Sequence, residues 1–483
     1  MSKYLGGEDP AGAATAEPHA LHRSGIAAAS EGRLSQAIEL FEEAVRLRPD
    51  FAQAHNDLGV VLGSLDRLEE AAAAFRAACR HQDGMIDAHL NLGSASQALG
   101  RLDDAVAAYS RVVEADPVRE EVRIELARML RSQGRAEEAV SVLEALPPGQ
   151  PVSAALFFNR GVSLQAAARE KEAESAFRRC IELDPDFALA YNNLGCLLRD
   201  ERKFEESVAT LRRAVELRPD LAVTHMNLGV AHLARGEPGA ALSALDRGLS
   251  LAPGNTRALA LKAVAHRELG DRDATRRLLD FDRFVRRHRV QAPDEFSSLE
   301  DFNAALARHV LEHPTLMSSP DAHATRKGRH SGNLLVEPKG PMAAFEAAIQ
   351  RAVVDYADAL SGQSDHPFPL SLPRQVALQS WGVVLGAGGH QIPHIHPGAW
   401  LSGVYYVQVP GIVDEQASEH AGWLEFGRPH PNYPCTAEPE VETVKPESGL
   451  MVLFPAYFYH HTIPFDSQEI RISIAFDVFR DED

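Results

Sequence analysis

A small residue recurs every 34 residues through the first half of the chain, and this period restricts the fold more than any other feature. The positions are Gly25, Gly59, Gly93, Ala127, Gly161, Gly195, Gly229 and Ala263. With the same step, a second column of small residues starts at Ala37 and a third, aromatic or leucine, starts at Phe41. A fixed period of this length is the signature of stacked supersecondary units. We therefore predict an all-α N-terminal superhelix of eight repeats.

Each column has a physical role in a helix pair. The small residue lets the first helix approach the second closely, the alanine column receives it, and the large side chain fills the remaining gap. Glycines fall between the two helices of several units, where a left-handed residue ends a helix: Gly32, Gly100, Gly134, Gly236 and Gly270. Prolines recur at the same step and end the second helix.

This pattern resembles the tetratricopeptide repeat, a 34-residue helix–turn–helix unit. The resemblance covers residues 19–282, although the tryptophan found early in many such repeats is missing. It implies a right-handed superhelix whose concave surface binds a protein or peptide. Residues 1–18 are rich in Ala, Gly, Pro and Glu without periodicity, and we expect them to form a disordered lead-in.

A polar column stands two residues before the small column, and we expect it to face the groove. We predict that it binds peptide through Asp57, Asn91, Asn159, Asn193 and Asn227. Asparagine offers one acceptor and two donors, so a row of them can hold the backbone of an extended peptide without reading its side chains. A similar asparagine ladder occurs in protein O-linked N-acetylglucosamine transferases. The alternative is that these residues only cap helices or solvate the inner face.

The pattern changes after the repeats, and residues 283–480 are expected to form a second domain. After a capping helix that leads into a first strand, we expect a helix starting near Glu295, a long loop over 315–335 and a helix over 342–360. Strands are expected over 374–385, 401–409, 422–426, 449–454 and 470–479. Two flanking helices and short strands indicate a double-stranded β-helix, or jelly roll. The predicted fold class is therefore α+β multidomain.

Two histidines, His394 and His396, stand at i and i+2 between prolines in this second domain. On an extended segment such side chains point to one face, so both imidazoles can reach one ion. His460 lies more than 60 residues further on and is the third candidate ligand, with His461 as a second choice. The sequence therefore predicts a metal site with three histidines.

Two enzyme families use such a site in a jelly roll. Cupins share the glycines and the histidines but add a glutamate shortly after the HxH pair, where Trp400 and Leu401 stand here. The 2-oxoglutarate/Fe(II) oxygenases instead need a cation, on the strand after the last histidine, for the distal carboxylate of 2-oxoglutarate. Arg471 is placed there, with Ser473 on the same face. This favours the oxygenase.

The motifs also resemble a bacterial and phage group of 2-oxoglutarate/Fe(II) oxygenases that includes members fused to tetratricopeptide repeats. The shared elements are an HxHP, a Ser-Gly-Val-Tyr-Tyr strand from Ser402, a Phe-Pro before His460, and Arg471-Ile-Ser. The resemblance implies the cofactors Fe(II), 2-oxoglutarate and O₂. It also implies that His394, His396 and His460 are catalytic metal ligands. The co-substrate would be bound by Arg471, Ser473, Tyr406 and Ser402.

The ligand set departs from the usual pattern, in which a carboxylate occupies the place of His396. Three readings stay open. All three histidines can be ligands, or His396 can be the first ligand with Gly398 in the carboxylate position, as in radical halogenases. The third reading supplies a carboxylate from elsewhere, with Glu425 as a candidate.

Taken together, the motifs predict a dioxygenase that oxidises, and most simply hydroxylates, a residue of a peptide or protein captured by the repeats. The alternatives are a non-catalytic tetratricopeptide adaptor with a metal-stabilised barrel, and a cupin-like three-histidine dioxygenase. The sequence identifies neither the substrate nor the oligomeric state.

Charge and composition restrict partners and location. The net charge of −19 argues against general binding to nucleic acid or to anionic membranes. The four cysteines show no CxxC spacing, the first residues do not read as a signal peptide, and no apolar run is long enough to span a bilayer. We therefore expect a cytoplasmic protein.

Overall fold

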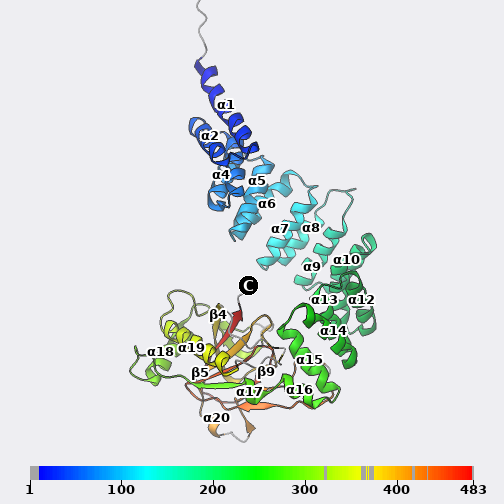
Figure 1. Ribbon diagram of the computed structural model, residues 1–483, viewed down its shortest axis with the longest axis vertical. Coiled ribbons are helices and arrows are strands. Elements are labelled where there is room, and N and C mark those ends of the chain that lie inside the picture. Colours follow the sequence, from blue (N-terminus) through cyan, green and yellow to red (C-terminus); the bar gives the residue numbers. More distant parts are fainter. Residues whose placement is uncertain are drawn as a thin grey trace, which may run out of the picture. The chain divides into compact units, whose positions relative to one another are not determined.

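The computed structural model describes residues 10–319, 324–360, 366, 368, 375–415, 419–431, 433 and 435–480 (Figure 1). The chain forms two compact units, residues 1–197 and residues 198–483.

The first unit consists of helices that follow the predicted repeat. They are α1 (Pro10–Ser30), α2 (Leu34–Leu47), α3 (Ala52–Ser64), α4 (Leu68–His81), α5 (Ile86–Ala98), α6 (Leu102–Ala115), α7 (Glu120–Ser132), α8 (Ala136–Glu144), α9 (Ala154–Ala166), α10 (Glu170–Leu183) and α11 (Ala188–Asp200), the last of which continues into the second unit. Of the expected lead-in, residues 1–9 lie outside the described residues, and residues 10–18 belong to α1.

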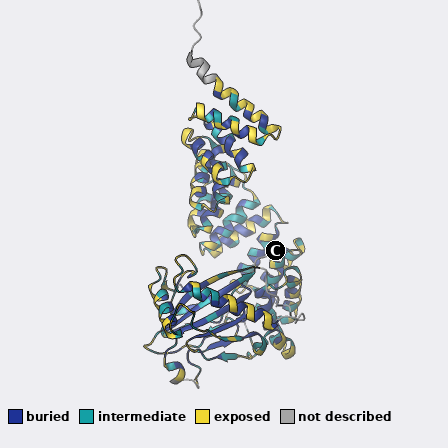
Figure 2. Ribbon diagram, turned by 60° about the vertical axis from the view of Figure 1, so that its left-hand side comes forward, coloured by how far each residue is buried: buried dark blue, intermediate teal, exposed yellow. Residues whose placement is uncertain are grey.

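The small column has the packing role predicted for it. A Cβ atom added to Gly25 would lie 2.6 Å from the ring of Phe41, and one added to Gly161 would lie 2.5 Å from Phe177. These distances are far shorter than a van der Waals contact, so the backbone of the first helix rests directly on the large residue of the second. Figure 2 shows the result as helices with one buried and one exposed face.

The turn inside each repeat uses a left-handed residue, as predicted for the glycines. Gly32 has φ of 76° and Gly134 has φ of 75°. The same column continues through Asp66, Ala168 and Arg202, whose φ values are 60°, 56° and 63°. These three residues adopt a left-handed backbone conformation, which costs roughly 1–2 kcal/mol relative to the right-handed one.

The second unit begins with the last repeat helices and continues into a sheet domain. Its first helices are α12 (Phe204–Leu217), α13 (Ala222–Ala234), α14 (Pro238–Leu251), α15 (Thr256–Glu268), α16 (Arg272–Leu278) and α17 (Phe281–Phe284). The sheet domain contains β1 (Arg286–Arg289), α18 (Leu299–Glu312), β2 (Met317–Ser318), β3 (Thr325–His330), α19 (Met342–Leu360), β4 (Val376–Gln391), β5 (Leu401–Gln408), α20 (Ile412–Glu415), β6 (Leu424–Phe426), β7 (Glu442–Val444), β8 (Leu450–Pro455), β9 (His460–Thr462) and β10 (Arg471–Arg480).

The strands form two antiparallel sheets, as expected for a jelly roll. The larger has the order β1-β8-β5-β10-β4-β3-β2 and the smaller has the order β7-β6-β9. In the larger sheet, Ser402 lies opposite Asp477 and Tyr406 lies opposite Ser473. Residues directly opposite each other in adjacent strands share a face, so β5 and β10 present all four side chains to one side of the sheet.

Three expectations about the strands were wrong. The segment 315–335 is not one loop, because β3 pairs with β4. Strand β4 also continues beyond its predicted end at residue 385 and ends only at Gln391. The short strands β7 and β9 were missed, since three residues are too few to show a period. The helix over 342–360 was correct in both of its bounds.

One hydrophobic core joins the last repeats to the sheet domain within the second unit. It includes Val230 and Leu261 from the repeat helices as well as Phe454 and Ile474 from the strands. The hydroxyl of Tyr457 also donates to the backbone oxygen of Leu278. The two compact units meet at residues 197/198. The boundary at 282/283 instead separates the predicted repeats from the predicted oxygenase domain, and it stays a prediction. Among the described helices, none is long and apolar enough to cross a membrane.

Candidate metal centre

Three histidines that are distant in the sequence converge in the second unit. His394, His396 and His460 offer ring nitrogens that all lie within 4.8 Å of one another. Their ring centroids are 4.3–5.1 Å apart. Such spacing is what one ion bound to three imidazoles requires.

Backbone pairing holds the three residues in place. His394 and His460 form an isolated antiparallel bridge, with two hydrogen bonds of 3.0 Å. The amide of His396 donates to the oxygen of Ala456 at 3.0 Å. The HxH pair is therefore an extended segment bound to the chain around β9, outside the regular strands.

Each histidine is also oriented through Nδ1, which leaves Nε2 for an ion. Nδ1 of His394 bonds the oxygen of Ile392 at 2.8 Å, and Nδ1 of His460 bonds that of Phe458 at 3.0 Å. His396 instead uses the carboxylate of Asp477, with distances of 2.7 and 2.8 Å, and its own Nε2 is buried without a partner. A hydrogen bond at one ring nitrogen fixes the tautomer, so the other nitrogen carries the lone pair.

Asp477 is a site residue that the sequence reasoning missed. Its carboxylate also accepts from the hydroxyl of Ser402 at 2.7 Å, so Ser402 reaches the site through Asp477. The indole of Trp381 stacks on the ring of His396 at 5.6 Å between centroids. A signal for Asp477 was present in the sequence, because it stands an even number of residues after Arg471 and Ser473 on one strand.

Burial keeps two of the imidazoles neutral. It lowers the pKa of His394 to about 3, with a further contribution from the nearby His396. Burial, followed by the neighbouring His394, also lowers the pKa of His460 well below its ordinary value. Neutral imidazole is the form that binds a metal ion.

The structure brings together the full histidine set and leaves the other candidates outside. His394 belongs to the cluster, which disfavours a register in which His396 is the first ligand and Gly398 takes the carboxylate position. Glu425 is engaged elsewhere, with Arg428 at 2.7 Å and His461 at 3.7 Å. The arrangement therefore supports the reading with three histidines and an outer carboxylate, Asp477.

Arg471 provides an isolated positive charge in the same region. It is 1% exposed, and its Nη1 donates to the oxygen of Gly422 at 2.8 Å. Its Nε has no partner, no acid pairs with it among the described residues, and burial lowers its pKa. The ring of Tyr406 lies 4.9 Å from the guanidinium carbon, and the buried Tyr406 hydroxyl has no partner either.

A single cavity of about 280 Å³ contains both groups. It is lined by the three histidines, by Arg471 and by alternate residues of β10, namely Ser473, Ala475 and Asp477. A buried cation without a counter-ion is costly. An anion that entered this cavity would therefore meet a site already built for it.

Comparisons with known protein families agree with this geometry. Residues 379–477 match the family described as "Putative 2OG-Fe(II) oxygenase", and tetratricopeptide repeat families match residues 22–85, 90–154, 154–187, 176–209 and 222–247. The protein combines tetratricopeptide repeats with a 2-oxoglutarate/Fe(II) oxygenase domain. No curated protein matches the chain.

Several solved structures are similar to part of this chain. A tetratricopeptide repeat protein from Parabacteroides merdae is 17% identical, over 52% of this chain and 98% of its own, with a TM-score of 0.37. The C-terminal part of a repeat protein from Cytophaga hutchinsonii is 14% identical, over 50% and 98%, with a TM-score of 0.41. MamA is 20% identical, over 34% and 91%, with a TM-score of 0.32.

The residues present in the oxygenase domain fit the groups that the family implies. Imidazole nitrogen is a suitable ligand for ferrous iron, and the unpartnered Nε2 of His396 is aimed into the cluster. The guanidinium of Arg471 fits a carboxylate, because its planar fork of donors matches two carboxylate oxygens. Both halves of the site are therefore compatible with Fe(II) and 2-oxoglutarate.

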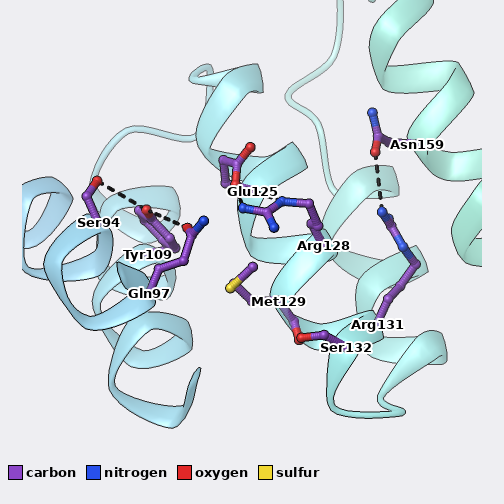
Figure 3. Close-up of polar contacts among 9 residues, drawn as sticks. All are labelled: Ser94, Gln97, Tyr109, Glu125, Arg128, Met129, Arg131, Ser132 and Asn159. Carbon is purple, nitrogen blue, oxygen red and sulfur yellow. Dashed lines mark hydrogen bonds and ion pairs between the residues drawn. The ribbon is translucent and has the colours of Figure 1, made fainter. Parts of the chain in front are cut away.

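The predicted peptide-binding column is already engaged in hydrogen bonds within the protein. Asp57 binds His22 at 2.8 Å, and the amide of Asn91 donates to Asn56 at 3.0 Å. Asn159 accepts from Arg131 at 3.4 Å (Figure 3). In the same column, Asn193 accepts from Asn192 at 3.0 Å, and Asn227 is buried. Each side chain has a definite orientation, and peptide binding by the column stays a prediction.

Proposed function

We propose that this protein hydroxylates a residue of a peptide or protein that its tetratricopeptide repeats hold. The oxygenase class follows from the family match and the histidine cluster. The observation that carries the assignment to this chain is Arg471, which lies buried in the cavity that also holds the histidines and has no acidic partner in the described part of the chain. A metal-stabilised adaptor would have no use for such a residue, since burying an unpaired charge destabilises the fold.

The residues have distinct roles in this proposal. His394, His396 and His460 hold the ion, and Asp477 keeps His396 in the required tautomer. Arg471 binds the distal carboxylate of 2-oxoglutarate, with Ser473 and the free hydroxyl of Tyr406 as further donors. When the ion and co-substrate are bound, the chemistry supplied is oxidation of a substrate C–H bond by O₂, with 2-oxoglutarate decarboxylated to succinate.

The cavity also controls water. The aromatic rings of Phe454 and Trp381 line it, and the rings of Phe454 and His460 are 4.6 Å apart. Exclusion of water strengthens the attraction between Arg471 and a carboxylate, because the local dielectric constant is low. It also protects a reactive site from side reactions.

Peptide capture is supported by the repeats themselves. Extended concave surfaces of stacked repeats serve to bind other proteins. The asparagines at 91, 159, 193 and 227 recur at one position of the unit. Asn91 uses its amide group for Asn56 and so keeps its carbonyl oxygen for an incoming backbone N–H.

The test is succinate release from protein loaded anaerobically with Fe(II) and then given 2-oxoglutarate and O₂. We expect slow turnover without substrate in the wild type and its loss in Arg471→Ala. Calorimetry should show 2-oxoglutarate binding to the wild type and none to the variant. Arg287→Ala is the matched control, because Arg287 is exposed and pairs with Glu442 at 3.0 Å. A wild type that neither binds nor consumes 2-oxoglutarate would refute the proposal.

A further inference from the structure

A second hollow, of about 750 Å³, lies in the unit formed by residues 198–483, next to the metal centre. Repeat residues line one part of it, and residues of the sheet domain, including the metal ligand His394, line the rest. The repeat residues are Arg199, Asp200, Arg202, Phe204, Val230, Ala234 and Arg257. The residues of the sheet domain are His394, Ile395, Pro397, His430, Pro431, Tyr433 and Tyr459. We call it the entrance groove.

The entrance groove carries positive charge that no acid neutralises among the residues that the structure describes. Its one lining acid, Asp200, is bound by Arg199 at 2.8 Å. Within the described part of the unit, neither Arg202 nor Arg257 has an ion-pair partner. Acids outnumber bases in this chain by 19, so two arginines left without acids in one groove form a local exception.

Arg257 is the better placed of the two. It is half-buried, whereas Arg202 is exposed. Arg257 and Tyr459 both line the entrance groove. Tyr459 directly precedes the metal ligand His460.

Hydrogen bonds attach the helix that carries Arg257 to the metal centre. The hydroxyl of Thr256 accepts from the amide of Gly398 at 3.3 Å, two residues after His396. At the other end of α15, Glu268 accepts from the amide and hydroxyl of Thr436 at 2.9 and 2.7 Å. Figure 1 shows α15 beside the strands near β9. The position of Arg257 relative to the histidines is therefore fixed within this unit.

We propose that the entrance groove binds the substrate segment next to the oxidised residue and that Arg257 takes the side-chain carboxylate of an internal Asp or Glu in it. The argument is charge complementarity, since a half-buried guanidinium without an acid matches a carboxylate in charge and shape. The groove volume is that of a pocket for a drug-sized ligand, so it admits several residues and not a chain end alone. The inference rests on the proposed function, because only an oxygenase would oxidise a residue next to the bound segment.

The test uses four synthetic peptide pools of equal length, acetylated and fluorescently labelled. All are degenerate in small neutral residues around one fixed central position. Three pools have an amidated C-terminus and carry Glu, Gln or Lys at the central position. The fourth pool carries Gln at the central position and has a free C-terminal carboxylate. Binding to the full chain is followed by fluorescence anisotropy, with and without Fe(II) and 2-oxoglutarate under anaerobic conditions.

We expect the Glu pool to bind about tenfold more tightly than the amidated Gln pool, as for one hydrogen-bonded charge pair. The difference should vanish in Arg257→Gln, and Arg257→Glu should favour the Lys pool. The variant Arg247→Gln is the control, because Arg247 is exposed on α14 outside the groove. Among the described residues Arg257 has no ion-pair partner, so its substitution removes no ion pair from the structure.

Three results would overturn the inference. They are equal binding of the Glu and amidated Gln pools, a Glu preference retained in Arg257→Gln, and tightest binding of the pool with a free C-terminus. The last result would show that Arg257 binds the C-terminal carboxylate of a peptide and not an internal side chain. Succinate release from the wild type separates the two proposals, because turnover without a Glu preference refutes only the groove, and a Glu preference without turnover refutes only the oxygenase.

Discussion

Replacing Arg471 by methionine is expected to stabilise the protein in the absence of 2-oxoglutarate and to remove its response to that compound. Methionine is long and flexible enough to fill the space. The substitution leaves the oxygen of Gly422 without its donor, which costs about 1–3 kcal/mol. It also removes a buried charge, whose burial costs several kcal/mol after relaxation.

We expect the balance to favour methionine by about 1–4 kcal/mol, taking the range found when buried ion pairs are replaced by well-packed apolar groups. The wild type should gain about 2.7 kcal/mol from 2-oxoglutarate at one hundred times its dissociation constant. The measurement is thermal denaturation of both proteins with and without 2-oxoglutarate, with Arg287→Met as the control. A variant that is clearly less stable than the wild type, or that is still stabilised by 2-oxoglutarate, would show that Arg471 is a structural residue.

Three further predictions concern the metal site and the repeats. Asp477→Asn should lower Fe(II) affinity about 10- to 100-fold in anaerobic calorimetry, because His396 loses the carboxylate that orients it. Gly161→Ala should lower the free energy of unfolding in urea by about 1–3 kcal/mol, because the new Cβ would lie 2.5 Å from Phe177. Ala168→Gly should raise it by about 1 kcal/mol, because Ala168 has φ of 56°.

The two predictions about the repeats each have a control with a different expected sign. Gly239→Ala on α14 should be stabilising by about 0.5–1 kcal/mol, since nothing lies within 4 Å of the new atom. Ala107→Gly should be destabilising by a similar amount, because Ala107 is exposed in the middle of α6. Fe(II) binding by Asp477→Asn equal to that of the wild type would show that His396 needs no carboxylate.

The repeats were predictable because the same physical problem recurs in each unit. One glycine against one ring is weak evidence, but Gly25 against Phe41 and Gly161 against Phe177 obey one rule at one spacing. The histidine cluster was predictable for a related reason. An HxH pair needs a distant partner, and the chain offered His460 more than 60 residues further on.

The missed features depend on pairing that a single sequence does not display. Strand β3 is rich in charged residues and becomes a strand because β4 pairs with it. Asp477 acquires its role only when β5 and β10 align in the register that places it opposite Ser402. The sequence does not single out Arg257, because its position beside the metal centre follows from the packing of α15.

The shared core of the second unit limits how this protein can change in evolution. Repeat units that contact only their neighbours can be gained, lost or exchanged by recombination at low cost. The last repeats are different, because Val230 and Leu261 belong to the same hydrophobic core as Phe454 and Ile474. A crossover at residue 283 would expose that core on both sides. We therefore expect the final repeats to be inherited together with the sheet domain, and gain or loss of repeats to be tolerated only among the earlier ones.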